Sequence, residues 1–101
     1  MTDKVTIVST AHGGCVVHPG HRTVDEGGIV EFRNRTGGEI VFSFPDSTLW
    51  ATAPNTTLGD KASSSGTLAS TLADASYVYS VYCKVGKEYA EGNSHPAFIV
   101  R

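Results

Sequence analysis

The chain has 101 residues, of which 40% are hydrophobic and 18% charged, and its formal net charge at pH 7 is −2. This length and composition predict one small soluble domain, residues 1–101, built around a single core. The eight Lys and Arg residues are scattered along the sequence and form no basic run that could follow a nucleic-acid backbone, so we expect no nucleic-acid partner.

No apolar run approaches the ~20 residues that cross a bilayer, so we expect no membrane span. The first residues, MTDKVTIV, show no charged segment followed by an apolar one, and no signal peptide is visible. As written, the sequence indicates a cytoplasmic protein, or a periplasmic or secreted one if Met1 replaces a removed leader. Cys15 and Cys83 would form a disulfide in an oxidising compartment and two thiols in a reducing one, and both states stay open.

Short segments bounded by turn residues open the chain. Residues 5–8 are β-branched or apolar and predict a first strand, and residues 15–17 predict a brief extended piece that stops at a His-Pro-Gly turn. Residues 22–25 predict an edge strand. His18 and His21 flank the proline and glycine, so we expect them to be exposed turn residues.

The clearest alternation lies in residues 29–33 and 39–44. Apolar side chains share one face of each predicted strand: Val30, Phe32, Ile40, Phe42 and Phe44. A period of two with one apolar face is typical of a half-buried antiparallel sheet. Residues 34–38 hold two glycines between the strands and predict the turn of a hairpin.

The second half of the chain is less regular. Residues 45–61 predict a long crossover along one sheet edge, with a short helix as the weaker alternative. Residues 63–66 are polar and predict a flexible segment, whereas Leu68 and Leu72 favour a strand over a helical turn. After a turn at 73–76, one strand face is predicted for Tyr77, Tyr79, Val81 and Cys83, and residues 97–101 form the last strand.

Seven or eight short strands at this spacing predict an all-β fold, either a two-sheet sandwich or a small barrel. No serine lies in a G-x-S-x-G motif, and the acidic residues show no pairing suited to acid–base catalysis. The glycine pairs are hairpin glycines and do not form a phosphate-binding loop. We therefore expect that the protein is not an enzyme.

Three motifs resemble the cupredoxin family, the plastocyanin-like blue-copper fold. Residues 30–34 (VEFRN) resemble its V-x-F-x-N strand, and residues 23–27 (TVDEG) resemble the turn before it. Residues 77–83 (YVYSVYC) resemble its tyrosine-rich strand ending in cysteine, ahead of a loop and an apolar strand. The resemblance covers most of the chain and fails across residues 45–76. It implies a cupredoxin-like Greek-key β-sandwich. An immunoglobulin-like sandwich is the alternative fold, but such domains rarely have a strand that ends in tyrosine and cysteine.

The resemblance also implies where copper ligands belong. A blue-copper site uses two imidazoles, a thiolate and a weak axial methionine. Cys83 fills the thiolate position, but neither Gly38 nor Glu39, where the first imidazole belongs, is a histidine. Residues 84–88, where the second belongs, contain no histidine, and the only methionine is the first residue. His95 lies where the family's axial ligand or its neighbour would be. Only one ligand of four, Cys83, is in register, so the resemblance implies that the standard site has been lost.

A rebuilt metal site is the alternative. In this fold the loop with His12 and Cys15 approaches the Cys83 end, and Cys15, Cys83, His12 and His95 together suit zinc or cuprous copper by ligand softness. A carboxylate from Glu39 would then replace the missing histidine. No tight spacing such as C-x-x-C supports this set. Two other roles for Cys83 stay open, a buried thiol that packs as a small apolar residue and a disulfide with Cys15.

We therefore expect a small non-catalytic binding or interaction module that has lost the standard blue-copper site. We expect no cofactor, and a protein or small molecule as partner. The loops at the Cys83 end, residues 10–15, 35–39 and 84–94, are the expected recognition surface. Tyr82 and Tyr89 are expected to be exposed and to contribute to it. The alternative function is a metal-binding or electron-transfer protein with a rebuilt copper or zinc site that uses Cys83 and His95.

Overall fold

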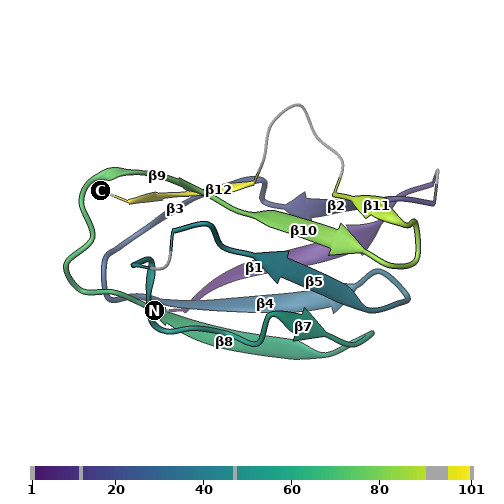
Figure 1. Ribbon diagram of the computed structural model, residues 1–101, viewed down its shortest axis with the longest axis horizontal. Coiled ribbons are helices and arrows are strands. Elements are labelled where there is room, and N and C mark those ends of the chain that lie inside the picture. The colour runs from purple at the N-terminus through teal and green to yellow at the C-terminus, as the bar shows by residue number, and fades with distance from the viewer. Residues whose placement is uncertain (1, 12, 47, 91–95, 101) are drawn as a thin grey trace.

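The computed structural model describes residues 2–11, 13–46, 48–90 and 96–100 (Figure 1). All regular structure within these residues is β-strand, which confirms the predicted all-β class. The strands of the described residues are β1 (Thr2–Ser9), β2 (Cys15–His18), β3 (His21–Val24), β4 (Ile29–Arg35), β5 (Ile40–Ser43), β6 (Trp50–Thr52), β7 (Thr57–Leu58), β8 (Ser63–Leu68), β9 (Ala75–Val78), β10 (Ser80–Cys83), β11 (Glu88–Tyr89) and β12 (Ala97–Val100). The weaker alternative of a short helix in residues 45–61 is wrong for the part of that segment that the structure describes.

The strands lie in two layers, as the predicted sandwich requires (Figure 1). One layer is a five-stranded sheet in the order β2-β1-β4-β8-β6, in which β1 and β4 run parallel. The other layer contains a four-stranded sheet, β11-β10-β5-β7, and a three-stranded sheet, β3-β12-β9. Tyr79 alone separates β9 from β10, so one stretch of chain passes from the three-stranded to the four-stranded sheet. No helix in the described residues is long and apolar enough to cross a membrane.

The predicted hairpin between residues 29–33 and 39–44 is wrong. β4 pairs with β1 and β8, whereas β5 pairs with β10 and β7 in the opposite layer. The alternation correctly identified the buried faces, but it does not specify which strand pairs with which. The two apolar faces meet across the core instead, where the ring centroids of Phe32 and Phe42 lie 4.6 Å apart.

Two segments of the second half also differ from the prediction. The polar residues 63–66 begin β8, which is hydrogen-bonded between β4 and β6, and do not form a flexible segment. At Gly66 a Cβ atom would lie 2.8 Å from Trp50 Cζ3, so the missing side chain lets the indole pack on the strand. Leu72 lies outside β8 and enters the core from a loop. The predicted turn at residues 73–76 already includes the start of β9.

Phe32 lies at the centre of the core and is fully buried. Its ring centroid lies 4.6–6.2 Å from those of the aromatic side chains around it, which come from both layers: Phe42, Phe44, Trp50, Tyr79 and Phe98. Tilted and edge-to-face contacts of this kind add to the stabilisation from area burial alone. The aromatic core therefore holds the two layers together, and the loops at the Cys83 end connect strands of these layers.

Burial raises the pKa of Tyr79, whose side chain is 2% exposed, above the ordinary tyrosine value. The phenol therefore ionises more readily in the unfolded chain than in the folded one. The free energy of unfolding is unaffected by this ionisation below the unfolded pKa of about 10, and it falls at higher pH because ionisation stabilises the unfolded chain. We expect the unfolding free energy of the wild type, measured with urea, to fall more steeply above pH ~10 than that of Tyr79→Phe. Equal slopes for the two proteins would contradict this expectation.

Candidate functional site

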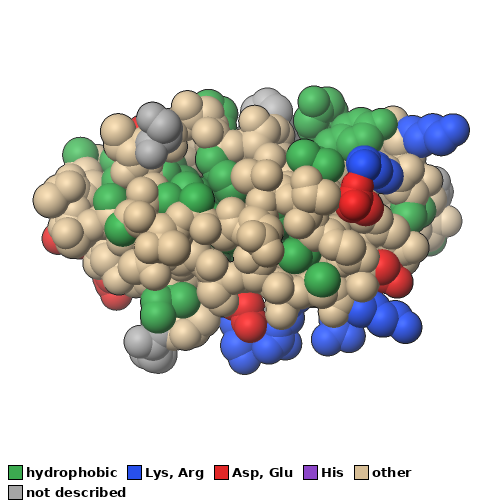
Figure 2. Space-filling model, turned by 60° about the horizontal axis from the view of Figure 1, so that its bottom comes forward, with side chains coloured by type: hydrophobic (Ala, Val, Ile, Leu, Met, Phe, Trp, Pro, Cys, Tyr) green, Lys and Arg blue, Asp and Glu red, His purple; other side chains and the backbone are tan. Residues whose placement is uncertain are grey.

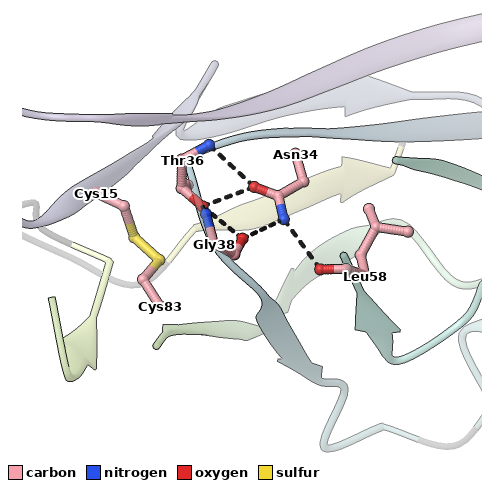
Figure 3. The surroundings of a disulfide bond; sticks show 6 residues. All are labelled: Cys15, Asn34, Thr36, Gly38, Leu58 and Cys83. Atoms are coloured by element: carbon pink, nitrogen blue, oxygen red, sulfur yellow. Dashed lines mark hydrogen bonds between the residues drawn. A yellow bond between two sulfur atoms is a disulfide. The ribbon is translucent and has the colours of Figure 1, made fainter. Parts of the chain in front are cut away.

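A disulfide between Cys15 and Cys83 lies at the end of the sandwich where β10 finishes (Figure 3). It joins the first residue of β2 to the last residue of β10, with the two Cα atoms 6.5 Å apart. Both cysteines are buried, at 0% and 1% exposure. Of the three roles left open for Cys83, the structure therefore selects the disulfide, and the free-thiol interpretation is wrong although the predicted burial is correct.

The described parts of the three predicted loops meet at this disulfide. Gly86 packs on the first loop so closely that a Cβ atom there would lie 2.5 Å from the Gly13 carbonyl oxygen. Val85 covers Gly38 in the loop between β4 and β5, because a Cβ atom on Gly38 would lie 2.2 Å from Val85 Cγ2. The loops are thus packed against one another without an intervening gap at these contacts.

Asn34, in β4, is a buried polar residue that organises the same end of the molecule (Figure 3). Its Nδ2 donates to the carbonyl oxygens of Gly38, Leu58 and Gly59 at 2.7, 2.9 and 2.9 Å. Its Oδ1 accepts from the backbone N–H and the hydroxyl of Thr36 at 3.0 and 2.7 Å. One side chain therefore ties the β4–β5 loop to the end of β7.

Sequence reasoning missed this role because it placed Asn34 in a polar turn. A signal was present, since the alternation that points Val30 and Phe32 inward also points the second residue after Phe32 inward. An inward Asn at a strand end needs hydrogen-bond partners. Backbone carbonyls of two loops are the partners here.

The resemblance to cupredoxins led us to expect the first imidazole ligand near Glu39, but the Glu39 carboxylate is paired with a lysine. Lys84 Nζ donates to Glu39 Oε1, and the backbone N–H of Lys84 donates to the Glu39 carbonyl oxygen at 3.0 Å. The two side chains are 39% and 56% exposed, so this ion pair adds little stability. Gly38, the neighbouring position, has no room for a side chain unless Val85 moves.

The residues predicted to bind metal divide into two groups. His12 and His95 lie outside the described residues, so their roles as ligands stay predictions. Cys15 and Cys83 are bonded to each other and carry no thiolate, which is the form that binds soft metals. Within the described ranges no three His, Cys, Asp or Glu residues gather in a group that could hold a metal ion. These described donors do not fit a blue-copper site.

His18 and His21 are exposed, as predicted, but they end β2 and begin β3 and do not lie in the turn itself. His18 lies at the end of β2 away from Cys15 and therefore away from the disulfide.

An exposed aromatic surface borders the disulfide end on the outer face of the four-stranded sheet. Tyr82 in β10 pairs in register with Tyr89 in β11 and with Val41 in β5. The two tyrosine rings lie edge to face, with centroids 5.3 Å apart. Tyr89 is 64% exposed and Val85, in the β10–β11 turn, is 50% exposed. Tyr89 is thus exposed as predicted, whereas Tyr82 is half-buried.

The contact between Gly38 and Val85 gives a direct test of the loop packing. Gly38→Ala is expected to lower the unfolding free energy by about 1–2 kcal/mol, because the added methyl group displaces Val85. The double variant Gly38→Ala/Val85→Ala should recover most of that loss in urea denaturation. Gly59→Ala is the matched control, since a Cβ atom there meets nothing within 4 Å. Additive losses in the double variant would contradict the contact.

The sequence matches no protein-family model and no curated protein. Solved structures do resemble it. A purple cupredoxin from Nitrosopumilus maritimus superposes with a TM-score of 0.62 at 11% identity, over 98% of this chain and 99% of that one. Oxidised plastocyanin from Dryopteris crassirhizoma gives a TM-score of 0.55 at 21% identity, over 97% and 99% of the two chains. A multicopper oxidase from Campylobacter jejuni gives 0.56 at 10% identity, over 99% of this chain but 25% of its own. Identities this low bear on the fold alone.

Proposed function

We propose that this chain, which has the cupredoxin fold, is a non-catalytic binding module whose disulfide-closed loop end serves recognition in place of copper binding. The observation that carries the proposal is the bond between Cys83 and Cys15, because it removes the thiolate from the position where the fold would use it. Copper needs a free thiolate and two imidazoles in this geometry. A disulfide instead fixes the strand ends on which the loops are mounted.

The neighbouring contacts support the same proposal. Val85 closes the space over Gly38, and the Glu39 carboxylate is paired with Lys84. A rigid scaffold that presents packed loops is a common arrangement for recognition. Exposed Tyr89 and Val85 next to the loops provide the aromatic and apolar contact area that protein interfaces favour. A protein partner therefore fits this surface better than a small molecule.

The disulfide also bears on the compartment. Structural disulfides form and persist in oxidising environments and are rare in a reducing cytosol. We therefore place the working protein in an oxidising compartment, which corresponds to the periplasmic or secreted alternative of the sequence prediction.

Copper titration separates this proposal from the metal-binding alternative. Wild type and Cys15→Ser/Cys83→Ser, both equilibrated under oxidising conditions, are titrated with Cu(II) and followed by visible absorption and elemental analysis. We expect equal copper uptake and no intense copper–thiolate band in either protein. A strong visible band in the wild type that disappears in Cys15→Ser/Cys83→Ser would favour the alternative, a rebuilt site with Cys83 and His95.

Partner recognition is tested with the exposed side chains of the loop end. Wild type and Tyr89→Ser/Val85→Ser are immobilised and exposed to the same extract of the source cells. We expect a retained protein that binds the wild type and is lost with the variant, because the aromatic and apolar contact area has been removed. Identical sets of retained proteins would count against this surface.

A further inference from the structure

Cations that are scattered along the sequence gather on the outer face of the five-stranded sheet. Val5 and Ile7 of β1 are buried, so Lys4 and Thr6 lie on the opposite, outer face. In the same way Phe32 and Asn34 point inward in β4, which places Arg33 and Arg35 outside. Thr6 pairs in register with both Arg33 and His18, so a guanidinium group and an imidazole flank it on two sides. We name Lys4, His18, Arg33 and Arg35 the basic face.

Only one acidic residue of the described strands lies among these cations. Glu31 accepts a hydrogen bond from Arg33 Nε at 3.0 Å and lies opposite Lys4 in the register of β1 and β4, so one carboxylate is shared among the cations, of which Lys4 and Arg35 have exposed side chains. Lys61 lies beside the same strand, because its backbone N–H donates to the Asn34 carbonyl oxygen at 3.0 Å. The basic face is therefore positive, although the whole chain carries a net charge of −2.

The cations are unevenly distributed along the molecule. Figure 2 shows Lys and Arg side chains together with acidic ones in the middle and on the right of that view, whereas the charged side chains seen towards its left end are acidic. The turn after β3 contributes Asp25 and Glu26, and the loop before β9 contributes Asp74. A region rich in cations attracts an acidic partner more strongly than an acidic end of the molecule does.

We propose that the basic face docks an acidic protein surface. Arg33 and Arg35 carry guanidinium groups, which match carboxylates with two donors at once. Half-buried Val8 lies beside Arg35 in register, so apolar area accompanies the charge, as in protein interfaces. The cations spread across β1, β2 and β4 in two dimensions. A nucleic-acid backbone would need a continuous track, and a lipid surface would need a protruding apolar residue among them.

Except for Arg35, which ends β4 where the β4–β5 loop begins, the basic face lies apart from the loop end, and this inference does not depend on the proposed function. The probe is fluorescently labelled poly-L-glutamate, whose binding to the full chain is followed by anisotropy at low salt. We expect Lys4→Glu/Arg35→Glu to weaken binding at least about tenfold. The matched control is Lys84→Glu/Lys87→Glu, which changes the net charge equally on the other layer and should weaken binding less than about twofold. Far-UV circular dichroism and urea midpoints show that both variants fold.

The other outcomes overturn the proposal. Equal weakening in both double variants would mean that net charge alone, and not the basic face, governs binding. Binding of the wild type that does not weaken between low and high salt would rule out a charge-driven contact. The same proteins are also tested against phosphatidylglycerol-containing vesicles and duplex DNA. Binding to either of these that depends on Lys4 and Arg35, with no binding to poly-L-glutamate, would assign the face to a membrane or to nucleic acid instead.

Discussion

Replacing both cysteines, in Cys15→Ser/Cys83→Ser, is expected to lower the free energy of unfolding by about 4 kcal/mol. The bond joins residues 68 positions apart, and a cross-link of that span removes much of the conformational freedom of the unfolded chain. Because a domain of this size has a total stability of only about 5–15 kcal/mol, this loss is a large share. Urea denaturation of the two proteins at equal pH measures it.

Reduction supplies the control for this variant. Adding dithiothreitol should bring the wild type close to the stability of the double-serine variant and leave that variant unchanged. Serine also replaces two buried sulfur atoms, and the comparison with the reduced wild type separates that packing effect from the cross-link. A wild type whose unfolding free energy does not respond to the reductant would contradict a stabilising disulfide.

Asn34→Ala is expected to cost about 3 kcal/mol of unfolding free energy. The substitution removes the donor for three carbonyl oxygens and the acceptor for Thr36, and it leaves these groups at a buried site without their partner. An unsatisfied buried polar group costs about 1–3 kcal/mol, and losses within one network are not additive. Urea denaturation gives the value, and amide hydrogen exchange should be faster in the loop from Thr36 to Gly38.

Two substitutions control for this effect. Asn55 is exposed, so Asn55→Ala should change stability by no more than about 0.5 kcal/mol. Asn34→Asp keeps an acceptor for Thr36 but points a carboxylate at the carbonyl oxygens, so it should be at least as destabilising as the alanine variant at pH 7. If Asn34→Asp were as stable as the wild type, the donor half of the network would have no energetic role.

The sequence predicted those parts of the fold in which local pattern and burial agree. Val30 with Phe32, and Ile40 with Phe42, lie on buried faces as their alternation indicates. The same pattern could not predict which strands pair. An alternating strand such as β4 or β5 can bury its apolar face whichever strands lie beside it. Residues 63–66 of β8 were missed because serine and glycine carry no alternation signal, and this part of the strand forms through its pairing with β4 and β6.

The candidate site was only partly predictable. The ending of β10 located Cys83, and the loops around it do meet at one end of the sandwich for the residues described. Whether Cys83 stays a thiol depends on the distance to Cys15, which is set by the packing of β2 and β10 and not by their separation in sequence. The basic face was likewise hidden, since Lys4, Arg33 and Arg35 come together only through the parallel register of β1 and β4.

Peptide mapping without reduction tests the central claim most directly. The protein is equilibrated in a glutathione redox buffer, unfolded in guanidinium chloride with iodoacetamide, digested and analysed by mass spectrometry. The account predicts one linked peptide pair that contains Cys15 and Cys83, with neither cysteine alkylated until a reductant is added. Full alkylation of both cysteines without reductant, in a protein that was folded beforehand, would contradict it.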